Sequence, residues 1–251
     1  MRVDVLLGEA PVVPADVADR VVVVLDVLRA ATTVATALAH GARAVVPFET
    51  VDEVAARVRV YARGEVLTAG ERRMQRISGF DLGNSPLEFT PEVLGGRTVL
   101  FTTTNGTVAL TATAGARACF FAGFVNAQAT VQAVLDALGQ HAGDVTIVCA
   151  GHERRLAFED VVCAGRLVRL LHAALPGVVR GDGARVAELA ERPYVGGVSS
   201  LAYDAQHARS LADAGFSADV SACLALDTFS VATAYVDRQL LRATTGGSSA
   251  R

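Results

Sequence analysis

Short apolar runs rich in valine alternate with alanine-rich stretches along most of this chain, and no other feature limits the fold as strongly. We expect β-strands at Val21–Leu25, Ala44–Pro47, Thr98–Phe101, Ala118–Phe121 and Val145–Cys149. Continuous apolar strands separated by helices are typical of a parallel sheet that is buried on both faces. The sequence therefore predicts a three-layer α/β/α fold with a largely parallel sheet and helices on both faces.

Helices are expected between and after these strands, at Ala30–Ala39, Val51–Tyr61, Val108–Ala114, Ala127–Leu138 and Phe158–Ala174. The alternation weakens after about residue 180, where Ala205–Ala214 and Val220–Arg238 are the best candidates for helices. We expect residues 1–242 to form a single α/β domain. Residues 243–251 are rich in Thr, Gly and Ser and are expected to form a flexible tail.

A faint internal repeat supports an α/β architecture. A shift of 74 residues lays Thr33-Val34-Ala35 on Thr107-Val108-Ala109, and Gly41–Ala44 on Gly115–Ala118. Alanine-rich segments resemble one another by chance, but two blocks that match at one fixed offset favour a real duplication. We therefore expect duplicated βαβ units.

The composition excludes several classes of protein. About half of the residues are apolar (51%), which indicates a globular chain, and a net charge of −3 provides no field suited to nucleic acid or an acidic membrane. All 23 basic residues are arginine, so a P-loop NTPase, a lysine Schiff-base enzyme and a lysine-dependent kinase are excluded. Arginine, backbone N–H groups, hydroxyls or a metal must hold any bound anion.

The cysteines and the apolar segments bear on the compartment. The four cysteines are far apart and contain no C-x-x-C pair, which indicates reduced thiols. The run from Val21 to Leu28 is too short to span a membrane and contains Asp26, and the N-terminus lacks the pattern of a signal peptide. We expect a cytoplasmic protein, and an apolar chain of this kind is compatible with a homodimer.

Polar residues follow three of the predicted strands, where the ligands of open α/β sheets bind. Asp26 and Arg29 follow the first strand, the loop Thr102–Thr107 follows another, and Gly151–Arg155 with Glu159 and Asp160 follows Val145–Cys149. Because such strand ends converge, we expect these side chains to meet.

The chemistry of these junctions points to an anion and a metal, with simpler alternatives open. Small hydroxyl residues at a helix start, as in Thr102–Thr107, suit an oxyanion but also serve as an N-cap. Asp26, Asp81, Glu159 and Asp160 supply oxygen ligands of the kind that Mg²⁺ prefers. Equally, Asp26 can form a structural ion pair with Arg29, and adjacent acids at a helix start often only complement its dipole.

The stretch Gly79–Glu88 packs two acids, an amide and a hydroxyl around two glycines and a proline. Gly and Pro fix an irregular backbone whose polar groups can bind a ligand. A surface turn with Ser85 as the N-cap of a short helix is the alternative. Asp81 and Asn84 are the candidate functional residues of this loop.

Other catalytic patterns fit poorly. Cys149 and Arg155 have the C-x5-R spacing of cysteine-dependent phosphatases, but the residues between them offer a carboxylate where N–H groups should face phosphate. Asp26-Val27-Leu28 lacks the D-x-D of the phosphatases with an aspartate nucleophile, and neither H-E-x-x-H nor G-x-S-x-G occurs. The scattered histidines do not indicate zinc.

In chain order, the motifs just described resemble the 2-phosphosulfolactate phosphatase (ComB-like) family. The resemblance covers about Val21 to Asp227, with Gly79–Pro86 and Thr103–Thr107 as its most specific parts. The other motifs that carry it are Asp26–Ala30, Gly70-Glu71-Arg72, Cys149-Ala150-Gly151 and Glu159-Asp160. The sequence departs from the family at Ala31, where a threonine is usual, and lacks a Val-Pro after Asp227.

The resemblance implies a Mg²⁺-dependent phosphatase that hydrolyses 2-phospho-3-sulfolactate to 3-sulfolactate and phosphate, a step toward coenzyme M in methanogens. On this basis Asp26, Glu159 and Asp160, or a subset of them, would hold Mg²⁺, and Asp26, Arg29 and Asp81 would be catalytic. The residues expected to bind the substrate are Arg29, Asn84, Thr103, Thr104, Asn105, Gly106 and Thr107. A phosphatase for another small phosphorylated hydroxy acid and a non-catalytic small-anion binding protein remain open.

Overall fold

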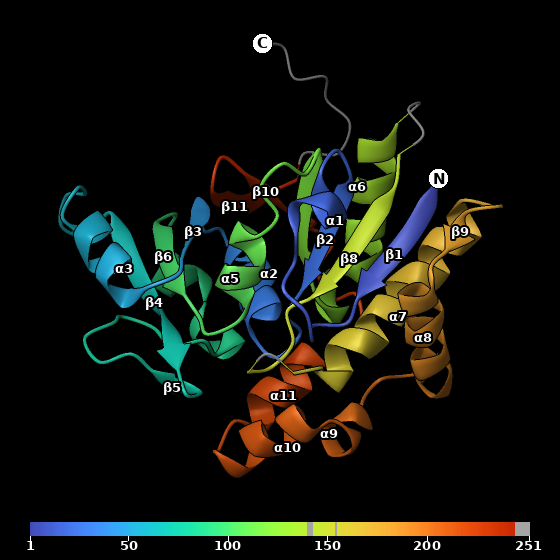
Figure 1. Ribbon diagram of the computed structural model, residues 1–251. Coiled ribbons are helices and arrows are strands. Elements are labelled where there is room, and N and C mark those ends of the chain that lie inside the picture. The colour runs from blue at the N-terminus through green and yellow to red at the C-terminus, as the bar shows by residue number, and fades with distance from the viewer. Residues whose placement is uncertain (140–142, 154, 244–251) are drawn as a thin grey trace.

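A sheet of eleven strands runs through the centre of the protein in the order β5-β4-β6-β3-β11-β10-β7-β2-β8-β1-β9, as the computed structural model shows (Figure 1). The structure describes residues 1–139, 143–153 and 155–243. The expected tail, 243–251, therefore lies almost entirely outside the described residues. The strands are β1 (Arg2–Leu6), β2 (Val21–Leu25), β3 (Ala44–Phe48), β4 (Val66–Arg72), β5 (Gln75–Arg76), β6 (Thr98–Thr102), β7 (Ala118–Ala122), β8 (Val145–Cys149), β9 (Val179–Arg180), β10 (Thr233–Val236) and β11 (Gln239–Arg242).

Helices lie on both faces of the sheet. They are α1 (Pro14–Val17), α2 (Ala30–Ala39), α3 (Val51–Val58), α4 (Pro91–Leu94), α5 (Gly106–Thr111), α6 (Ala127–Leu138), α7 (Phe158–Ala174), α8 (Asp182–Glu191), α9 (Leu201–Asp204), α10 (Gln206–Asp213) and α11 (Ser217–Cys223), with 3-10 turns η1 (Pro86–Glu88), η2 (Phe124–Asn126) and η3 (Arg192–Tyr194). Among the described helices, none combines the length and the apolar character needed to cross a membrane.

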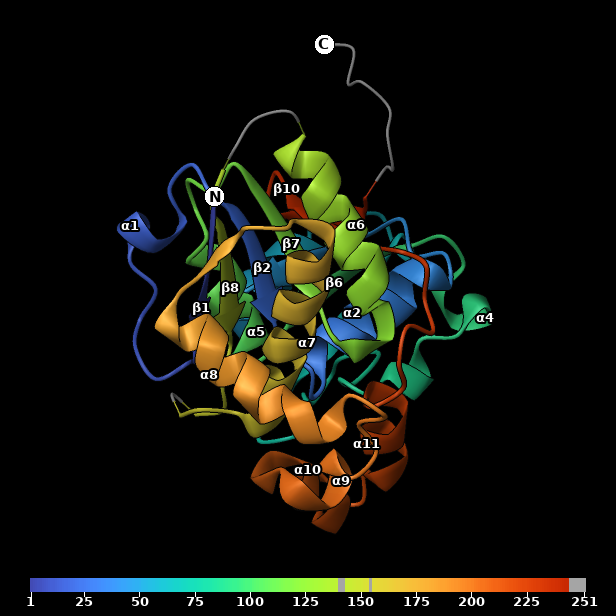
Figure 2. The same cartoon turned by 90° about the vertical axis from the view of Figure 1, so that its right-hand side faces the viewer.

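The burial of β2 explains the layered arrangement. All five of its residues are buried: Val21, Val23 and Leu25 pack into the core under α6 and α7, while Val22 and Val24 pack into a second core with α2 and α5. A strand covered on both faces has no solvent side, so it consists only of apolar residues. Figure 2 shows α6, α7 and α8 in front of the sheet. The predicted three-layer α/β fold is confirmed.

The sheet has two halves, parallel except for the edge strand β5, and the antiparallel hairpin β10–β11 joins them. Within the described residues, three residue pairs connect the hairpin to the halves: Thr233 with Phe121, Ala234 with Phe120, and Leu240 with Val45. The helix expected over Val220–Arg238 was wrong: α11 ends at Cys223, residues 224–232 form neither helix nor strand, and β10 begins at Thr233.

The segments that share the internal repeat have equivalent places in the sheet. The unit β2-α2-β3 begins beside β7 and ends beside β6, whereas β6-α5-β7 begins beside β3 and ends beside β2. Each unit therefore starts in the half where the other ends. This exchange suits two related units, and their duplication stays a prediction.

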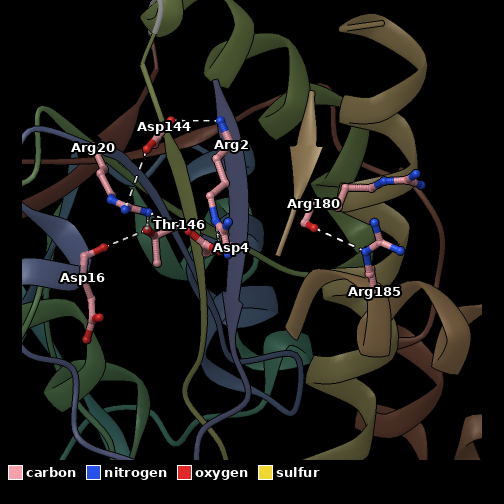
Figure 3. Close-up of polar contacts among 8 residues, drawn as sticks. All are labelled: Arg2, Asp4, Asp16, Arg20, Asp144, Thr146, Arg180 and Arg185. Atoms are coloured by element: carbon pink, nitrogen blue, oxygen red, sulfur yellow. Dashed lines mark hydrogen bonds and ion pairs between the residues drawn. The ribbon is translucent and has the colours of Figure 1, made fainter. Parts of the chain in front are cut away.

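Charged side chains tie the amino-terminal ends of β1, β2 and β8 together (Figure 3). Arg20 donates from Nη1 to Asp4 Oδ2 (2.9 Å) and to Thr146 Oγ1 (3.2 Å), and the Arg2 backbone N–H donates to Asp144 Oδ1 (2.8 Å). Every carboxylate in this group accepts from an arginine. The candidate site lies at the other ends of these strands.

Candidate active site

A cavity of about 270 Å³ lies at the carboxyl ends of β2, β4, β6 and β8. Asp26 directly follows β2, Glu71 lies near the end of β4, Thr103 follows β6, and His152 follows β8. The helices α9, α10 and α11, which we call the helical cap, gather beyond these strand ends in both views (Figures 1 and 2). His207 of α10 lies on the cavity wall. Four strands and one helix that are distant in sequence thus form one site.

Six of the residues predicted from sequence lie on the cavity wall, and they come from three separate segments. They are Asp26, Arg29, Asn84, Thr103, Thr104 and Asn105. Gly106 and Thr107 lie directly behind Asn105 in the first turn of α5. Of the three predicted metal ligands, Asp26 lies on the cavity wall. Glu159 and Asp160 are buried and do not line the cavity.

Gly106 allows the loop after β6 to approach Asp26 closely. A Cβ atom at this position would lie 2.6 Å from Asp26 Oδ2 and 3.2 Å from the side chain of Ala30. Any other residue would push the loop away from the carboxylate. Within the loop, Thr107 Oγ1 donates to the Thr103 carbonyl (3.0 Å), so this hydroxyl holds the loop and is not available to a ligand.

The carboxyl group of Asp26 is 7% exposed, and its environment disfavours the charged form. Removal from water raises its pKa from 3.8 to about 6, although the Ala30 N–H, 3.1 Å from Oδ1, and the nearby His207 favour the carboxylate. A carboxyl group with a strongly raised pKa on a cavity wall is a common property of functional sites. A bound cation would remove much of this cost.

Asp160 connects the ends of two strands. Its Oδ1 accepts from the Val27 N–H (2.9 Å), just after β2, and its Oδ2 accepts from the Gly151 N–H (3.1 Å), just after β8. Burial, together with the carboxyl groups of Glu159 and Asp26, raises the pKa of Asp160 well above its usual value. Because both oxygens accept from the backbone, Asp160 positions these two strand ends, and its role as a metal ligand stays a prediction.

Glu159 orients a histidine pair. The His207 Nδ1 donates to Glu159 Oε1 (3.1 Å), and the rings of His207 and His152 stack with centroids 3.9 Å apart. Burial and the neighbouring His207 lower the pKa of His152. The predicted ligand Glu159 thus has one oxygen occupied by His207, and both imidazoles line the cavity.

Arg29 is buried and pairs with a residue from the helical cap instead of Asp26. Its Nη1 donates to Asp219 Oδ2 (2.6 Å) and its Nη2 to the Met74 carbonyl (2.8 Å), and its guanidinium lies 4.2 Å from the centre of the Phe216 ring. The other oxygen of Asp219 accepts from Ser85 Oγ (2.7 Å). Ser85 therefore ties the Gly79–Glu88 loop to α11 and does not cap η1.

Asp81 lies outside the cavity. Its exposed carboxylate accepts from the backbone N–H and the hydroxyl of Thr68, both at 2.8 Å. These bonds fix the loop beside β4 and give Asp81 a structural role, and its catalytic role stays a prediction. Asn84, three residues later, does reach the cavity.

Unpartnered polar atoms concentrate at this cavity. In the described part of the chain, seven buried side-chain polar atoms have no hydrogen-bond partner. Asn84 Oδ1, Thr103 Oγ1 and His152 Nδ1 belong to cavity residues, and Glu159 Oε2 lies just behind the wall. Buried polar atoms are nearly always bonded, so the concentration of these atoms marks the cavity as the candidate site.

The larger groove of the molecule has no such atoms. It measures about 560 Å³ and lies beside β3, α3 and the turn Asp237–Arg238. None of the unpartnered buried atoms of the described residues lies on its walls. We therefore place the site in the smaller cavity, where the polar chemistry is concentrated.

The donors at the cavity suit a magnesium ion held in part by its substrate. The described residues contain no group of three or more His, Cys, Asp or Glu side chains arranged to hold a metal. Mg²⁺ often binds through one or two carboxylates together with water and substrate phosphate. Asp26, whose Oδ2 makes no hydrogen bond within the described residues, fits that pattern.

Cys149 is unsuited to act as a nucleophile. Burial, with the carboxyl groups of Asp160 and Glu159 nearby, raises the pKa of its thiol well above the ordinary value. Cys149 lines a neighbouring cavity of about 380 Å³ and not the cavity that Asp26 lines. The C-x5-R spacing is therefore coincidental.

Several site residues were not selected from the sequence. Glu71 lies in a recognised motif, but its bonds to Thr104 could not be foreseen. His152 follows a predicted strand, which is a usable signal. His207 and Asp219 come from the helical cap, where nothing in the local sequence marks them.

Comparison with known proteins gives a consistent answer. Residues 10–238 match the family model described as 2-phosphosulpholactate phosphatase. A relative from Caldanaerobacter subterraneus subsp. tengcongensis, named a probable 2-phosphosulfolactate phosphatase, is 36% identical over 216 residues, or 86% of this chain and 88% of the relative. A protein of the same name from Pseudothermotoga lettingae is 38% identical over 241 residues, or 96% of this chain and 98% of the relative.

Proposed function

This chain belongs to the 2-phosphosulfolactate phosphatase family of phosphoric monoester hydrolases, and we propose that it hydrolyses 2-phospho-3-sulfolactate to 3-sulfolactate and phosphate with the help of Mg²⁺. We place it in the cytoplasm, where thiols stay reduced, in keeping with four buried cysteines that form no disulfide. The names of its relatives specify this substrate, and the cavity beside Asp26 supports the same substrate for this chain.

One observation carries the proposal: the unpartnered Asn84 Oδ1, Thr103 Oγ1 and His152 Nδ1 all belong to one cavity, next to the carboxyl group of Asp26. A phosphate ester has several acceptor oxygens and could satisfy Thr103 and the Asn84 amide, if its NH₂ turns inward. The stacked imidazoles lie on the same wall. The cavity thus offers hydroxyl, amide and imidazole groups for one small anion.

The residues of the cavity would have different roles in hydrolysis. Thr103, Asn84 and Asn105 would bind and orient the phosphoryl group, beside Arg29, whose guanidinium is held in place by Asp219. His207, oriented by Glu159, is placed to hold or move a proton at its Nε2. Asp26 would hold Mg²⁺, which supplies neutralisation of phosphoryl charge when bound.

Phosphate release tests the proposal. We would measure it with racemic 2-phospho-3-sulfolactate and with 2-phospholactate, in Mg²⁺ and in EDTA. The proposal predicts turnover that prefers the sulfonate and stops in EDTA. Turnover of phospholactate alone would identify a phosphatase for another hydroxy acid, EDTA-resistant turnover would contradict the metal, and binding without turnover would indicate a small-anion binding protein.

A further inference from the structure

Among the described residues, three arginines line the cavity, and two of them are already bonded to other parts of the protein. Arg29 bonds Asp219 and the Met74 carbonyl, and Arg72 bonds the carbonyls of Glu71 and Glu49 and the hydroxyl of Thr102. Arg73 is exposed, lines the cavity, and makes no hydrogen bond or ion pair with any part of the chain that the structure describes. Among the described residues, therefore, nothing occupies the guanidinium of Arg73.

The backbone around Arg73 is unusual. Arg73 and Met74 form the two-residue turn between β4 and β5, because Arg72 pairs with Gln75 across the hairpin. Both turn residues have positive φ angles, 51° and 67°. Turns of this kind normally use Asn-Gly or Asp-Gly, and side chains in the left-handed region at both positions cost free energy that other contacts must offset.

Two buried side chains hold this turn in place. The Met74 N–H donates to Glu71 Oε2 (2.9 Å), and the Met74 carbonyl accepts from Arg29 Nη2 (2.8 Å). Glu71 is 8% exposed and Arg29 is 3% exposed, so both contacts are partly shielded from water. The position of Arg73 at the cavity is thus set by the folded protein before a ligand arrives.

Glu71 also joins the turn to the loop that we propose for phosphate. Its Oε1 accepts from the backbone N–H and the hydroxyl of Thr104, both at 2.9 Å. One buried carboxylate therefore fixes the separation between the Thr103–Asn105 loop and the Arg73–Met74 turn. A rigid separation of this kind selects ligands with two acidic groups a set distance apart.

We propose that Arg73 is a specificity-determining residue that binds a second acidic group of the substrate, a sulfonate or a carboxylate, while the phosphate lies at the Thr103–Asn105 loop. This inference rests on the proposed phosphatase function. The planar guanidinium suits an oxyanion because it donates two parallel hydrogen bonds. Simple phosphomonoesters lack the second acid and gain nothing from Arg73.

Three substrates separate the possible roles of Arg73: 2-phospho-3-sulfolactate, 2-phospholactate, which lacks the sulfonate, and isopropyl phosphate, which lacks both acids. Phosphate release would be measured for the wild type, Arg73→Gln and Arg73→Lys. The matched control is Arg63→Gln, which removes an exposed arginine before the other end of β4. Melting temperatures of all variants verify folding.

We expect Arg73→Gln to lower kcat/KM for phosphosulfolactate about tenfold more than for isopropyl phosphate, mainly through KM, as a lost charged hydrogen bond predicts. Arg73→Lys should recover part of the loss, and Arg63→Gln should leave all three rates unchanged. If the substitution lowers kcat/KM for phospholactate as much as for phosphosulfolactate, Arg73 binds the carboxylate. If kcat/KM for phospholactate does not fall, Arg73 binds the sulfonate.

The test separates this inference from the proposed function. The wild type could release phosphate while Arg73→Gln changes kcat/KM for all three substrates equally, or for none of them. In that case the role of Arg73 is wrong and the proposed phosphatase function stands. If the wild type releases phosphate from none of the three, the proposed function fails and the role of Arg73 fails with it.

Discussion

The two ends of the central strands use the same charged residue types in opposite ways. At the amino-terminal ends, Asp4 is 24% exposed, and the hydrogen bonds from Arg2 and Arg20 hold its pKa below the usual value even though burial alone would raise it. At the carboxyl ends, burial raises the pKa of Asp26 to about 6. The first cluster is satisfied, whereas the second contains unpartnered atoms and a disfavoured charge.

The difference between the two ends indicates which of them carries the function. Paired charges near water cost little and contribute little, so the amino-terminal network needs no explanation beyond the fold. A buried carboxyl group without a cationic partner lowers stability and persists where activity requires it. The two ends should therefore respond differently to mutation, pH and salt.

The largest effect is expected for Asp26→Asn. The amide keeps the shape of the side chain but removes the charge that the proposed Mg²⁺ requires, so kcat/KM should fall by about a thousandfold. The melting temperature should stay the same or rise, because a disfavoured buried charge is lost. Phosphate release and a thermal melt of the same sample measure both; activity near that of the wild type would remove Asp26 from the mechanism.

Asp219→Ala should cause the largest loss of stability. It leaves the buried Arg29 guanidinium without its carboxylate and deprives Ser85 of an acceptor. Removing one partner of a buried ion pair typically costs about 3–5 kcal/mol. Urea unfolding measures the change, with Asp219→Asn as the variant that preserves shape; a loss below about 1 kcal/mol would mean that the helical cap is not anchored through Arg29.

The stability of the metal-free protein should fall as the pH rises from about 4 to about 6. Over this range the native state holds a proton on Asp26 that the unfolded state has already lost, so unfolding becomes easier with rising pH. A pKa that moves from 3.8 to about 6 corresponds to about 3 kcal/mol. The difference between wild type and Asp26→Asn in urea unfolding should grow across this range, and a constant difference would contradict the assigned environment.

The smallest effect is expected at the amino-terminal network. Arg20→Gln removes bonds to Asp4 and Thr146 from a side chain that is 25% exposed. Solvent screening limits the loss to less than about 1 kcal/mol, and 1 M NaCl should remove most of it. Urea unfolding at low and high salt tests this; a loss as large as that of Asp219→Ala would erase the contrast between the two ends.

The fold was predictable where local signals and burial agree. The apolar run Val21–Leu25 is buried on both faces, so its sequence and its position carry the same information. The hairpin β10–β11 was not foreseen, because its turn Asp237–Arg238 lacks glycine although both residues have positive φ angles. The hairpin β4–β5 was not foreseen for the same reason, because its turn Arg73–Met74 also lacks glycine and has two positive φ angles.

The site was predictable only in part, for a related reason. Asp26 and Thr103 were found because polar residues after parallel strands mark a ligand edge. His207 bonds a residue 48 positions away, and Asp219 bonds Arg29 across 190 positions. Such contacts depend on where the helical cap packs, and no spacing in the sequence encodes them.

A crystal structure of the protein soaked with Mg²⁺, phosphate and 3-sulfolactate tests the central claim most directly. The account predicts phosphate in the cavity of about 270 Å³, within hydrogen-bond distance of Thr103 Oγ1 and the Asn84 side chain. Ligand density in the groove beside α3 and Asp237–Arg238, with the cavity at Asp26 holding only water, would contradict it.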